Sequence, residues 1–255
     1  MLDLIIKNGW VVNATHSQQT DIAVKDGKIV AMGRASLFPE AEKTVDAAGL
    51  WVLPGMIDTH VHMNKRFGAS PSQDNYYNGS IAAAYGGTTA IVDFGFPYGD
   101  ETPAQAMERK LEEIKGQSVI DYSFHSNLTK ANEENYGQIR ELIQQGFPSV
   151  KMFTIFSYGR MLEKAGIYEV LRIIAKENGL SMIHTESADL IDRYIADTVA
   201  KGHTLPIDLA KTRPPITELE ALYALIAMVE DTGAPDGFRC GTCHCKGKTD
   251  HAAVY

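Results

Sequence analysis

After Leu53 the chain alternates short apolar runs with stretches of helical periodicity, and this alternation constrains its fold more than any other feature. Strands are predicted near residues 55–62, 88–95, 119–126, 149–156 and 181–186. The stretches 187–202 and 216–231 carry apolar side chains at helical spacing, so they are expected to pack outside the sheet. Because strands that alternate with helices form parallel sheets, an α/β fold is expected.

The first fifty residues follow a different pattern. Short alternating strands are separated by the turn pairs Asn8-Gly9 and Asp26-Gly27. This pattern predicts a small β domain over residues 1–52 and a larger α/β domain over residues 53–235. The last twenty residues, 236–255, differ in composition from both domains.

Two histidines, His60 and His62, follow the apolar run that begins at Trp51. On a strand, residues two apart face the same side, so both imidazole rings are expected on one face. A divalent metal is the simplest partner that two such rings can share. The alternative is a pair of strand histidines that are satisfied by hydrogen bonds alone.

Two later strand-like runs carry further candidate ligands, Lys151 and His184. Burial of a lysine disfavours its ammonium form, which makes a neutral and nucleophilic amine available. Such an amine can add carbon dioxide to give a carbamate, an anionic oxygen ligand able to bridge two metal ions. The alternative is that Lys151 lies at a strand end and extends its amine to water.

Seven segments, taken together, resemble the amidohydrolase superfamily and, within it, the hydantoinase and dihydropyrimidinase group. The segments are VKDGKIV (24–30), LPGMIDTHVH (53–62), SIAAAYGGTT (80–89), VIDYSFH (119–125), SVKMF (149–153), IHTE (183–186) and TRPPITELEA (212–221). The resemblance runs in register from the start of the chain to about Pro235. It implies a (β/α)8 TIM barrel over residues 53–235 that is incomplete, because only five strands and an expected sixth are present.

The resemblance also implies an activity, the metal-dependent hydrolysis of a cyclic ureide such as a hydantoin or a dihydropyrimidine. One metal would be held by His60, His62 and the carbamate on Lys151, and the other by that carbamate and His184. Zinc suits these ligands, although manganese, cobalt or iron are alternatives. A histidine from the sixth strand and a general-base aspartate from the eighth are implied as well, and neither is recognised in the chain.

The expected substrate is less sharply defined than the chemistry. Relatives place a tyrosine five residues after the bridging lysine, where this chain has Phe156, which cannot donate a hydrogen bond to an oxyanion. Tyr158 is the candidate substitute, and Phe156 and Tyr158 are both expected to contact substrate. Activities like those of dihydroorotase or allantoinase are therefore alternatives.

All three cysteines of the chain lie within six residues of the tail, Cys240 to Cys245. We hypothesise that a one-nucleotide frameshift near codon 236, followed by premature termination, produced this tail. When the codons of the tail are read one nucleotide later, they can encode an apolar strand that ends in histidine. The sequence of the gene downstream tests this hypothesis. Taken as written, Cys240-Gly-Thr-Cys243-His244 offers two alternatives, covalent haem attachment and an adventitious zinc site.

Composition excludes several classes of function. The chain has 255 residues, a formal net charge of -8 and 44% hydrophobic residues, with no basic patch for nucleic acid and no apolar stretch that spans a membrane. A cytoplasmic enzyme is expected, with a small-molecule substrate, and relatives are commonly dimers or tetramers. Three alternatives remain: an active hydrolase, an impaired or inactive fragment, and a non-catalytic homologue that serves in assembly. We expect the chain to have poor hydrolase activity.

Overall fold

The computed structural model describes residues 1–67, 70–156 and 159–235. The chain divides into two compact units, Met1–Met56 and the chain from Ile57 onward. The first unit contains a four-stranded sheet of order β5-β4-β1-β6 and a three-stranded sheet of order β3-β2-β7. Its elements are β1 (Leu2–Lys7), β2 (Trp10–Val12), β3 (Ser17–Gln19), β4 (Asp21–Lys25), β5 (Lys28–Gly33), the 3-10 helix η1 (Ala35–Leu37), β6 (Ala41–Asp46) and β7 (Trp51–Val52).

A two-residue turn joins β4 to β5 at the predicted position. Asp26 and Gly27 have φ angles of 50° and 71°, and hairpin turns that require positive φ at both central residues favour this pair. The small core of the unit consists of Leu2, Ile5 and Ala23, which are buried against one another. The local sequence thus specifies both the hairpin and the apolar face that packs beneath it.

The second unit is built on a five-stranded sheet of order β14-β13-β12-β11-β8. Its strands are β8 (Met56–Asp58), β11 (Thr88–Gly95), β12 (Asp121–Asn127), β13 (Ser149–Phe153) and β14 (Leu180–His184), and a separate pair is formed by β9 (Arg66–Phe67) and β10 (Ser70–Pro71). Strands β11 to β14 pair in parallel with their neighbours in sequence order. This arrangement confirms the predicted α/β fold, a partial TIM barrel with an N-terminal β domain.

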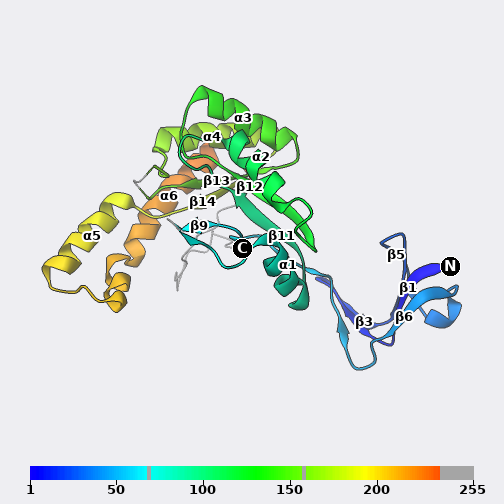
Figure 1. Ribbon diagram of the computed structural model, residues 1–255. Coiled ribbons are helices and arrows are strands. Elements are labelled where there is room, and N and C mark those ends of the chain that lie inside the picture. Colours follow the sequence, from blue (N-terminus) through cyan, green and yellow to red (C-terminus); the bar gives the residue numbers. More distant parts are fainter. Residues whose placement is uncertain (68–69, 157–158, 236–255) are drawn as a thin grey trace. The chain divides into compact units, whose positions relative to one another are not determined.

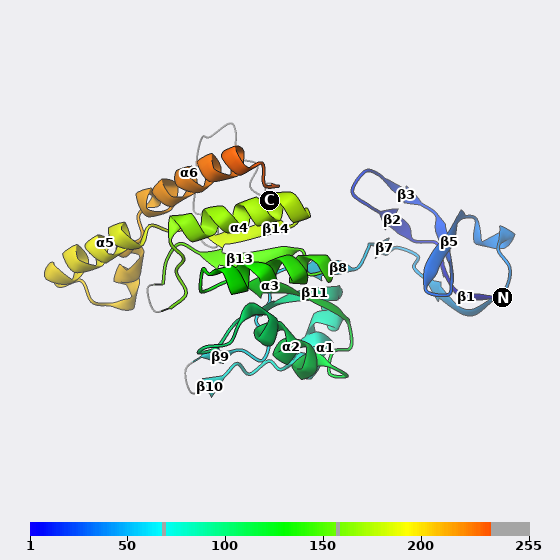
Figure 2. The same cartoon turned by 90° about the horizontal axis from the view of Figure 1, so that it is seen from above.

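Helices follow the strands in turn. They are α1 (Tyr76–Tyr85), α2 (Pro103–Ile114), α3 (Glu133–Gln144), α4 (Lys164–Glu177), α5 (Ala188–Ala200), the 3-10 helix η2 (Pro206–Thr212) and α6 (Pro215–Thr232). Helix α2 packs on α3, α3 on α4 and α4 on α6, and Figure 1 shows α2, α3 and α4 together on one side of the strands. Seen from above in Figure 2, α6 runs alongside α4. The predicted helices 187–202 and 216–231 correspond to α5 and α6.

The main core lies between strands β13 and β14 and these helices. Every residue of β13 is buried, as expected for a parallel strand that is covered on both faces. Ile139 of α3, Leu171 and Ile174 of α4 and Ile183 of β14 are fully buried in the same cluster. This packing fixes the carboxyl ends of β13 and β14, which carry candidate site residues.

The predicted strand over residues 55–62 is too long. Strand β8 ends at Asp58, and its three residues are exposed. The Asp58 carboxylate accepts a hydrogen bond of 3.0 Å from the backbone N–H of His60, so this N–H does not join the strand ladder. His60 and His62 therefore lie in the segment after the strand, and the expectation that both occupy one face of a buried strand was wrong.

None of the helices in the described part of the chain combines the length and the apolar character that crossing a membrane requires. The expected sixth strand and the cysteines of the tail lie outside the described residues.

Candidate active site

A cavity of about 260 Å³ opens at the carboxyl ends of the parallel strands. Its wall contains all four predicted metal ligands, His60, His62, Lys151 and His184, together with Phe156. The ligands come from the segment after β8, from β13 and from β14. Catalytic groups of (β/α)8 barrels occupy the same end of their strands, so this cavity is the candidate active site.

Phe94, at the end of β11, is the aromatic centre of the cavity wall. Its ring centroid lies 4.6 Å from that of His60 and 4.8 Å from that of His62, and the two histidine rings are 5.2 Å apart. The Lys151 Nζ lies 5.9 Å from the centroid of the same ring. One buried phenylalanine thus brings together three candidate ligands from two segments of the chain.

His62 is neutral at physiological pH. Burial, and after it the charges of Lys65, His60, Lys151 and Lys110, together lower the pKa of His62 to about 3. A metal-binding histidine must be unprotonated to donate its nitrogen lone pair. The electrostatics of the cavity therefore favour the form of His62 that binds a metal.

Lys151 lies inside the protein. The residue is only 4% exposed, and its Nζ lies 4.9 Å from the centroid of the Phe153 ring. The extension of its amine to bulk water, the alternative left open by the sequence, does not fit this burial. Lys151 is one of the residues that line the cavity.

His184 is held by a carboxylate that is itself held by an arginine. The His184 Nε2 and the Glu186 Oε2 are 2.8 Å apart, and the Arg213 Nε lies 3.2 Å from the other oxygen of Glu186. Although burial acts to raise the pKa of Glu186, the hydrogen bond to His184 and the charge of Arg213 hold it below its usual range. With Nε2 engaged, Nδ1 is the nitrogen of His184 that remains for a ligand.

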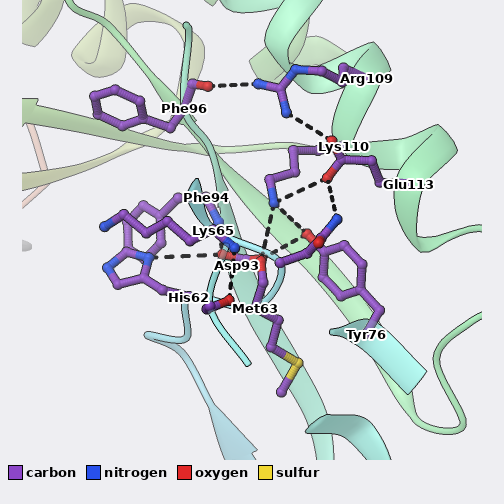
Figure 3. Close-up of polar contacts among 12 residues, drawn as sticks. His62, Met63, Lys65, Tyr76, Asp93, Phe94, Phe96, Arg109, Lys110 and Glu113 are labelled. Atoms are coloured by element: carbon purple, nitrogen blue, oxygen red, sulfur yellow. Dashed lines mark hydrogen bonds and ion pairs between the residues drawn. The ribbon is translucent and has the colours of Figure 1, made fainter. Parts of the chain in front are cut away.

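A buried polar network lies behind His62 (Figure 3). The Tyr76 hydroxyl donates a 2.7 Å hydrogen bond to the Asp93 Oδ2, and the Lys110 Nζ donates one of 2.8 Å to the Tyr76 oxygen. The Lys110 Nζ also lies 3.7 Å from the Asp93 Oδ2 and 3.4 Å from the Glu113 Oε2. The network thereby joins α1, β11 and α2 beneath the histidine segment.

Asp93 links this network to the candidate metal ligands. Its Oδ1 lies 3.9 Å from the His62 Nδ1. Burial raises the pKa of Asp93, while the charge of Lys110 and the hydrogen bond from Tyr76 act in the opposite direction. Carboxylates in this position commonly orient metal-binding histidines through the ring nitrogen that the metal does not use.

His125 is a structural histidine that anchors the His60 segment. Its Nδ1 pairs with the Ser149 hydroxyl, and its Nε2 lies 2.9 Å from the carbonyl oxygen of Thr59. Both ring nitrogens are therefore used within the fold, and the residue is 5% exposed. His125 fixes the backbone immediately before His60 and is not itself a candidate ligand.

Asn127, at the end of β12, presents unsatisfied polar atoms to the cavity. The residue is 1% exposed, it lines the cavity, and neither its Oδ1 nor its Nδ2 has a hydrogen-bond partner. Buried polar side chains without partners are rare in native proteins. These atoms, beside Lys151 in the adjacent strand, indicate that a polar group belongs in the cavity, which fits bound metal and substrate.

The described residues do not complete a metal site from conventional ligands. Within residues 1–67, 70–156 and 159–235, no three histidine, cysteine, aspartate or glutamate side chains approach closely enough to hold a metal ion. The candidate set therefore depends on Lys151 as an additional ligand.

Phe156 has a φ angle of 75°, a left-handed conformation that is strained for a bulky residue. This backbone places its ring on the cavity wall, with the centroid 5.3 Å from that of His184. Strained residues of this kind cluster at functional sites. Tyr158, the other residue expected to contact substrate, lies outside the described residues.

Several residues of the cavity wall were not predicted from the sequence, namely Lys65, Asp93, Lys110, Asn127 and Arg160. Asp93 gave a weak signal, because it interrupts the apolar residues of β11. Lys65 and Arg160 gave none, since isolated cations in polar segments usually face solvent.

Comparison with known proteins identifies a family. The family model described as "Amidohydrolase family" matches residues 51–245. The D-hydantoinase of Geobacillus stearothermophilus is 36% identical over 232 residues, which cover 90% of this chain and 49% of that protein. The dihydropyrimidinase of Rattus norvegicus is 33% identical over 237 residues, which cover 91% of this chain and 46% of the relative.

Solved structures show the same relationship. The crystal structure of dihydropyrimidinase from Brevibacillus agri NCHU1002 superposes with a TM-score of 0.85 at 34% identity, over 92% of this chain and 50% of that one. A structure of D-hydantoinase superposes with a TM-score of 0.88 at 35% identity, over 93% of this chain and 51% of that one. This chain spans about half the length of the curated relatives it matches. On its sequence and its fold, the chain belongs to the amidohydrolase family.

Proposed function

We propose that this cavity is the centre of a metal-dependent hydrolase that opens cyclic amides, namely hydantoins, dihydropyrimidines or related cyclic ureides. The observation that carries the proposal is the convergence of His60, His62, Lys151 and His184 on one cavity. The relatives named D-hydantoinase and dihydropyrimidinase support this class of substrate.

Members of the amidohydrolase family generally depend on metal ions. In our proposal His60, His62 and a carbamate on Lys151 would hold one ion, and that carbamate and His184 would hold the other. Zinc suits this mixture of imidazole and anionic oxygen, and manganese, cobalt or iron suit it as alternatives. The further histidine and the general-base aspartate that the family resemblance implies are not among the described residues.

The proposed reaction is the addition of water to a ring amide. The water oxygen bonds to the carbonyl carbon, the ring C–N bond breaks, the leaving nitrogen takes a proton, and an open-chain ureido acid is released. When bound, the metal ions would polarise the carbonyl oxygen and lower the pKa of the attacking water.

The residues of this chain prepare the site for that chemistry. His62 stays neutral through burial and neighbouring charge, and Glu186 fixes the orientation of His184. Phe94, Phe153 and Phe156 supply an apolar wall. Such a wall excludes bulk water from around the ring and strengthens the electrostatic contacts within the cavity.

Metal content and turnover, measured on the same preparation, test this proposal. Inductively coupled plasma mass spectrometry of the purified chain is expected to find about two metal ions per chain, as in two-metal hydrolases. Slow hydrolysis of hydantoin and dihydrouracil should accompany them, because the general-base aspartate is not among the described residues. Lys151→Ala removes the bridging ligand and is expected to weaken metal binding by more than about 100-fold.

A rescue experiment separates loss of the carbamate from loss of the fold. A short carboxylate such as acetate fits the space that Lys151→Ala vacates and supplies an anionic oxygen, so it should restore part of the metal content. Lys115→Ala, at an exposed position after α2, is the matched control and should retain its metal. Full metal content in Lys151→Ala, or none in the wild-type chain, contradicts the proposed site.

A further inference from the structure

Asn127 is a buried amide that neither the fold nor the proposed ligand set uses. Its side chain is 1% exposed and lines the cavity. Within the described part of the chain, its Oδ1 and Nδ2 atoms have no hydrogen-bond partner. A buried donor or acceptor that is left unsatisfied destabilises the folded state. Asn127 therefore points to a group that binds beside it and that the unmodified chain does not supply.

The strand register places Asn127 beside Lys151. The two residues are direct partners in the parallel pair of β12 and β13, and the Leu128 N–H donates a 3.0 Å hydrogen bond to the Lys151 carbonyl oxygen. Both side chains line the cavity. Two residues earlier on the same strands, and so on the same face, the His125 Nδ1 pairs with the Ser149 hydroxyl. Side chains at this spacing on β12 and β13 thus do meet.

The Lys151 side chain extends over β12, where Asn127 lies. Its Nζ lies 5.9 Å from the centroid of the Phe94 ring, and Phe94 belongs to β11, on the other side of β12. Because β11 and β13 are two strand spacings apart, roughly 9.5 Å, these two side chains approach each other above β12.

The opposite neighbour of Lys151 cannot replace Asn127. On that side Lys151 pairs with Met182 of β14, and a thioether has no N–H or O–H to donate. Asn127 is thus the strand partner of Lys151 that can donate hydrogen bonds to a group on the lysine.

A carbamate on Lys151 would present the partners that the Asn127 amide lacks. In its formation the neutral amine bonds to the carbon of dissolved carbon dioxide and one N–H proton passes to solvent. The product keeps one N–H beside two oxygens that share a negative charge. An asparagine amide has two N–H donors and a carbonyl acceptor, so it can donate to a carbamate oxygen and accept from the carbamate N–H. Hydrogen bonds to an anion are roughly twice as strong as neutral ones.

We propose that Asn127 is a positioning residue for the Lys151 carbamate, in which the Asn127 Nδ2 donates to a carbamate oxygen and the Oδ1 accepts the carbamate N–H. The inference rests on the proposed function, because it requires the carbamate. It adds a residue that stabilises the modified lysine and fixes its orientation. Modification of Lys151 satisfies the buried amide, so Asn127 favours the modified form over the free amine.

The bicarbonate dependence of carbamate formation tests the inference. A chelator in degassed buffer first removes metal and carbon dioxide, and the chain then receives a fixed concentration of zinc with increasing isotope-labelled bicarbonate. Carbon NMR follows the carbamate, and mass spectrometry of the desalted chain measures zinc. Asn127→Leu keeps the approximate shape of the side chain without its donors. It should raise the bicarbonate concentration for half-maximal carbamate roughly 10- to 100-fold, the range for a hydrogen bond to a charged group. Asn127→Ala should shift it by a similar factor.

The stability of the stripped chain separates positioning from a structural role. Without carbamate, Asn127→Leu removes two unsatisfied polar atoms, so the midpoint of urea denaturation should rise. A residue that merely supports the fold would lower the midpoint and the carbamate signal together.

Ser181→Ala is the matched control. Ser181 is fully buried on the neighbouring strand β14, and its hydroxyl has no hydrogen-bond partner among the described residues. Unlike Asn127, it does not belong to the described lining of the cavity. This variant should leave the bicarbonate dependence unchanged.

Turnover of hydantoin and dihydrouracil, measured on the same samples, separates this inference from the proposed function. Wild-type carbamate and zinc with an unchanged bicarbonate dependence in Asn127→Leu, or a lower urea midpoint together with a weaker carbamate signal, overturns the inference and leaves the hydrolase standing. A shifted dependence without hydrolysis keeps the inference and removes the hydrolase. A shifted dependence with hydrolysis supports both, and a wild-type chain with neither carbamate nor zinc contradicts both.

Discussion

Replacement of Lys110 by methionine should lower the free energy of unfolding of the second unit. The decrease should be larger than for any substitution at an exposed position of α2. Lys110 and Asp93 are both 3% exposed at their side chains, and the Lys110 Nζ lies 3.7 Å from the Asp93 Oδ2. At an effective dielectric constant of about 20, charges at that distance attract each other by about 4.5 kcal/mol. Part of this attraction is offset because methionine does not need the solvation that a buried ammonium loses.

The expected net loss for Lys110→Met is about 3 kcal/mol, at the lower end of the range for breaking a buried ion pair. Urea denaturation followed by circular dichroism measures the free energy of unfolding. Lys115→Met is the control, because its pair with Glu112 is 74% and 77% exposed and such pairs contribute less than about 1 kcal/mol. A double-mutant cycle with Asp93→Asn should then show a coupling of about 2 kcal/mol.

The pH dependence of Lys110→Met follows from Asp93. Burial already raises the pKa of this carboxyl, and Lys110 opposes that rise, so removal of Lys110 raises the pKa further. When the pKa of a carboxyl is higher in the folded state than in the unfolded state, the free energy of unfolding decreases as pH rises from the unfolded pKa through the folded pKa. The deficit of Lys110→Met should therefore be larger at pH 8 than at pH 5. A deficit below about 1 kcal/mol at both pH values, or one that is larger at pH 5, refutes this reasoning.

Three further outcomes are expected. Gly137→Ala in α3 meets no neighbouring atom within 4 Å, so it should raise the free energy of unfolding by about 0.5 to 1 kcal/mol in urea denaturation. Gly95→Ala would place a Cβ 2.3 Å from the Met107 Sδ, and a fall of about 1 to 3 kcal/mol is expected in the same assay. The pKa of Glu186 is lowered in the folded state, so its contribution is present above the unfolded pKa and is lost as pH falls through the folded pKa. Between pH 5 and pH 3 the wild-type chain should thus lose more stability than Glu186→Gln, and equal losses contradict that assignment.

The outline of the fold could be predicted from local patterns. Strands β11, β12, β13 and β14 lie within or close to the predicted strands, because short strand-like stretches that alternate with helical periodicity are typical of βα units. The Asp26-Gly27 turn was predictable because few residue pairs tolerate positive φ at both positions. These features depend on residues that are neighbours in sequence.

The limits of the predictions also have physical causes. The strand before His60 was predicted too long because the apolar run 51–57 was extended to the two histidines, whereas the His60 N–H bonds to the Asp58 carboxylate and not to a neighbouring strand. The division between the units falls at Met56, near the predicted limit of residue 52. Local composition places such a division only to within a few residues, since contacts and not composition define it.

The sequence by itself indicated which residues are candidate metal ligands, because two histidines directly after an apolar run, a lysine inside a second run and a histidine at the end of a third are unusual patterns. Only the tertiary structure decided what surrounds them. Asp93, Lys110 and Tyr76 meet across β11, α2 and α1, and Lys65 and Arg160 reach one cavity from distant segments. Charge and burial at a site are sums over neighbours in space, and isolated polar residues in a sequence carry no record of which neighbours those are.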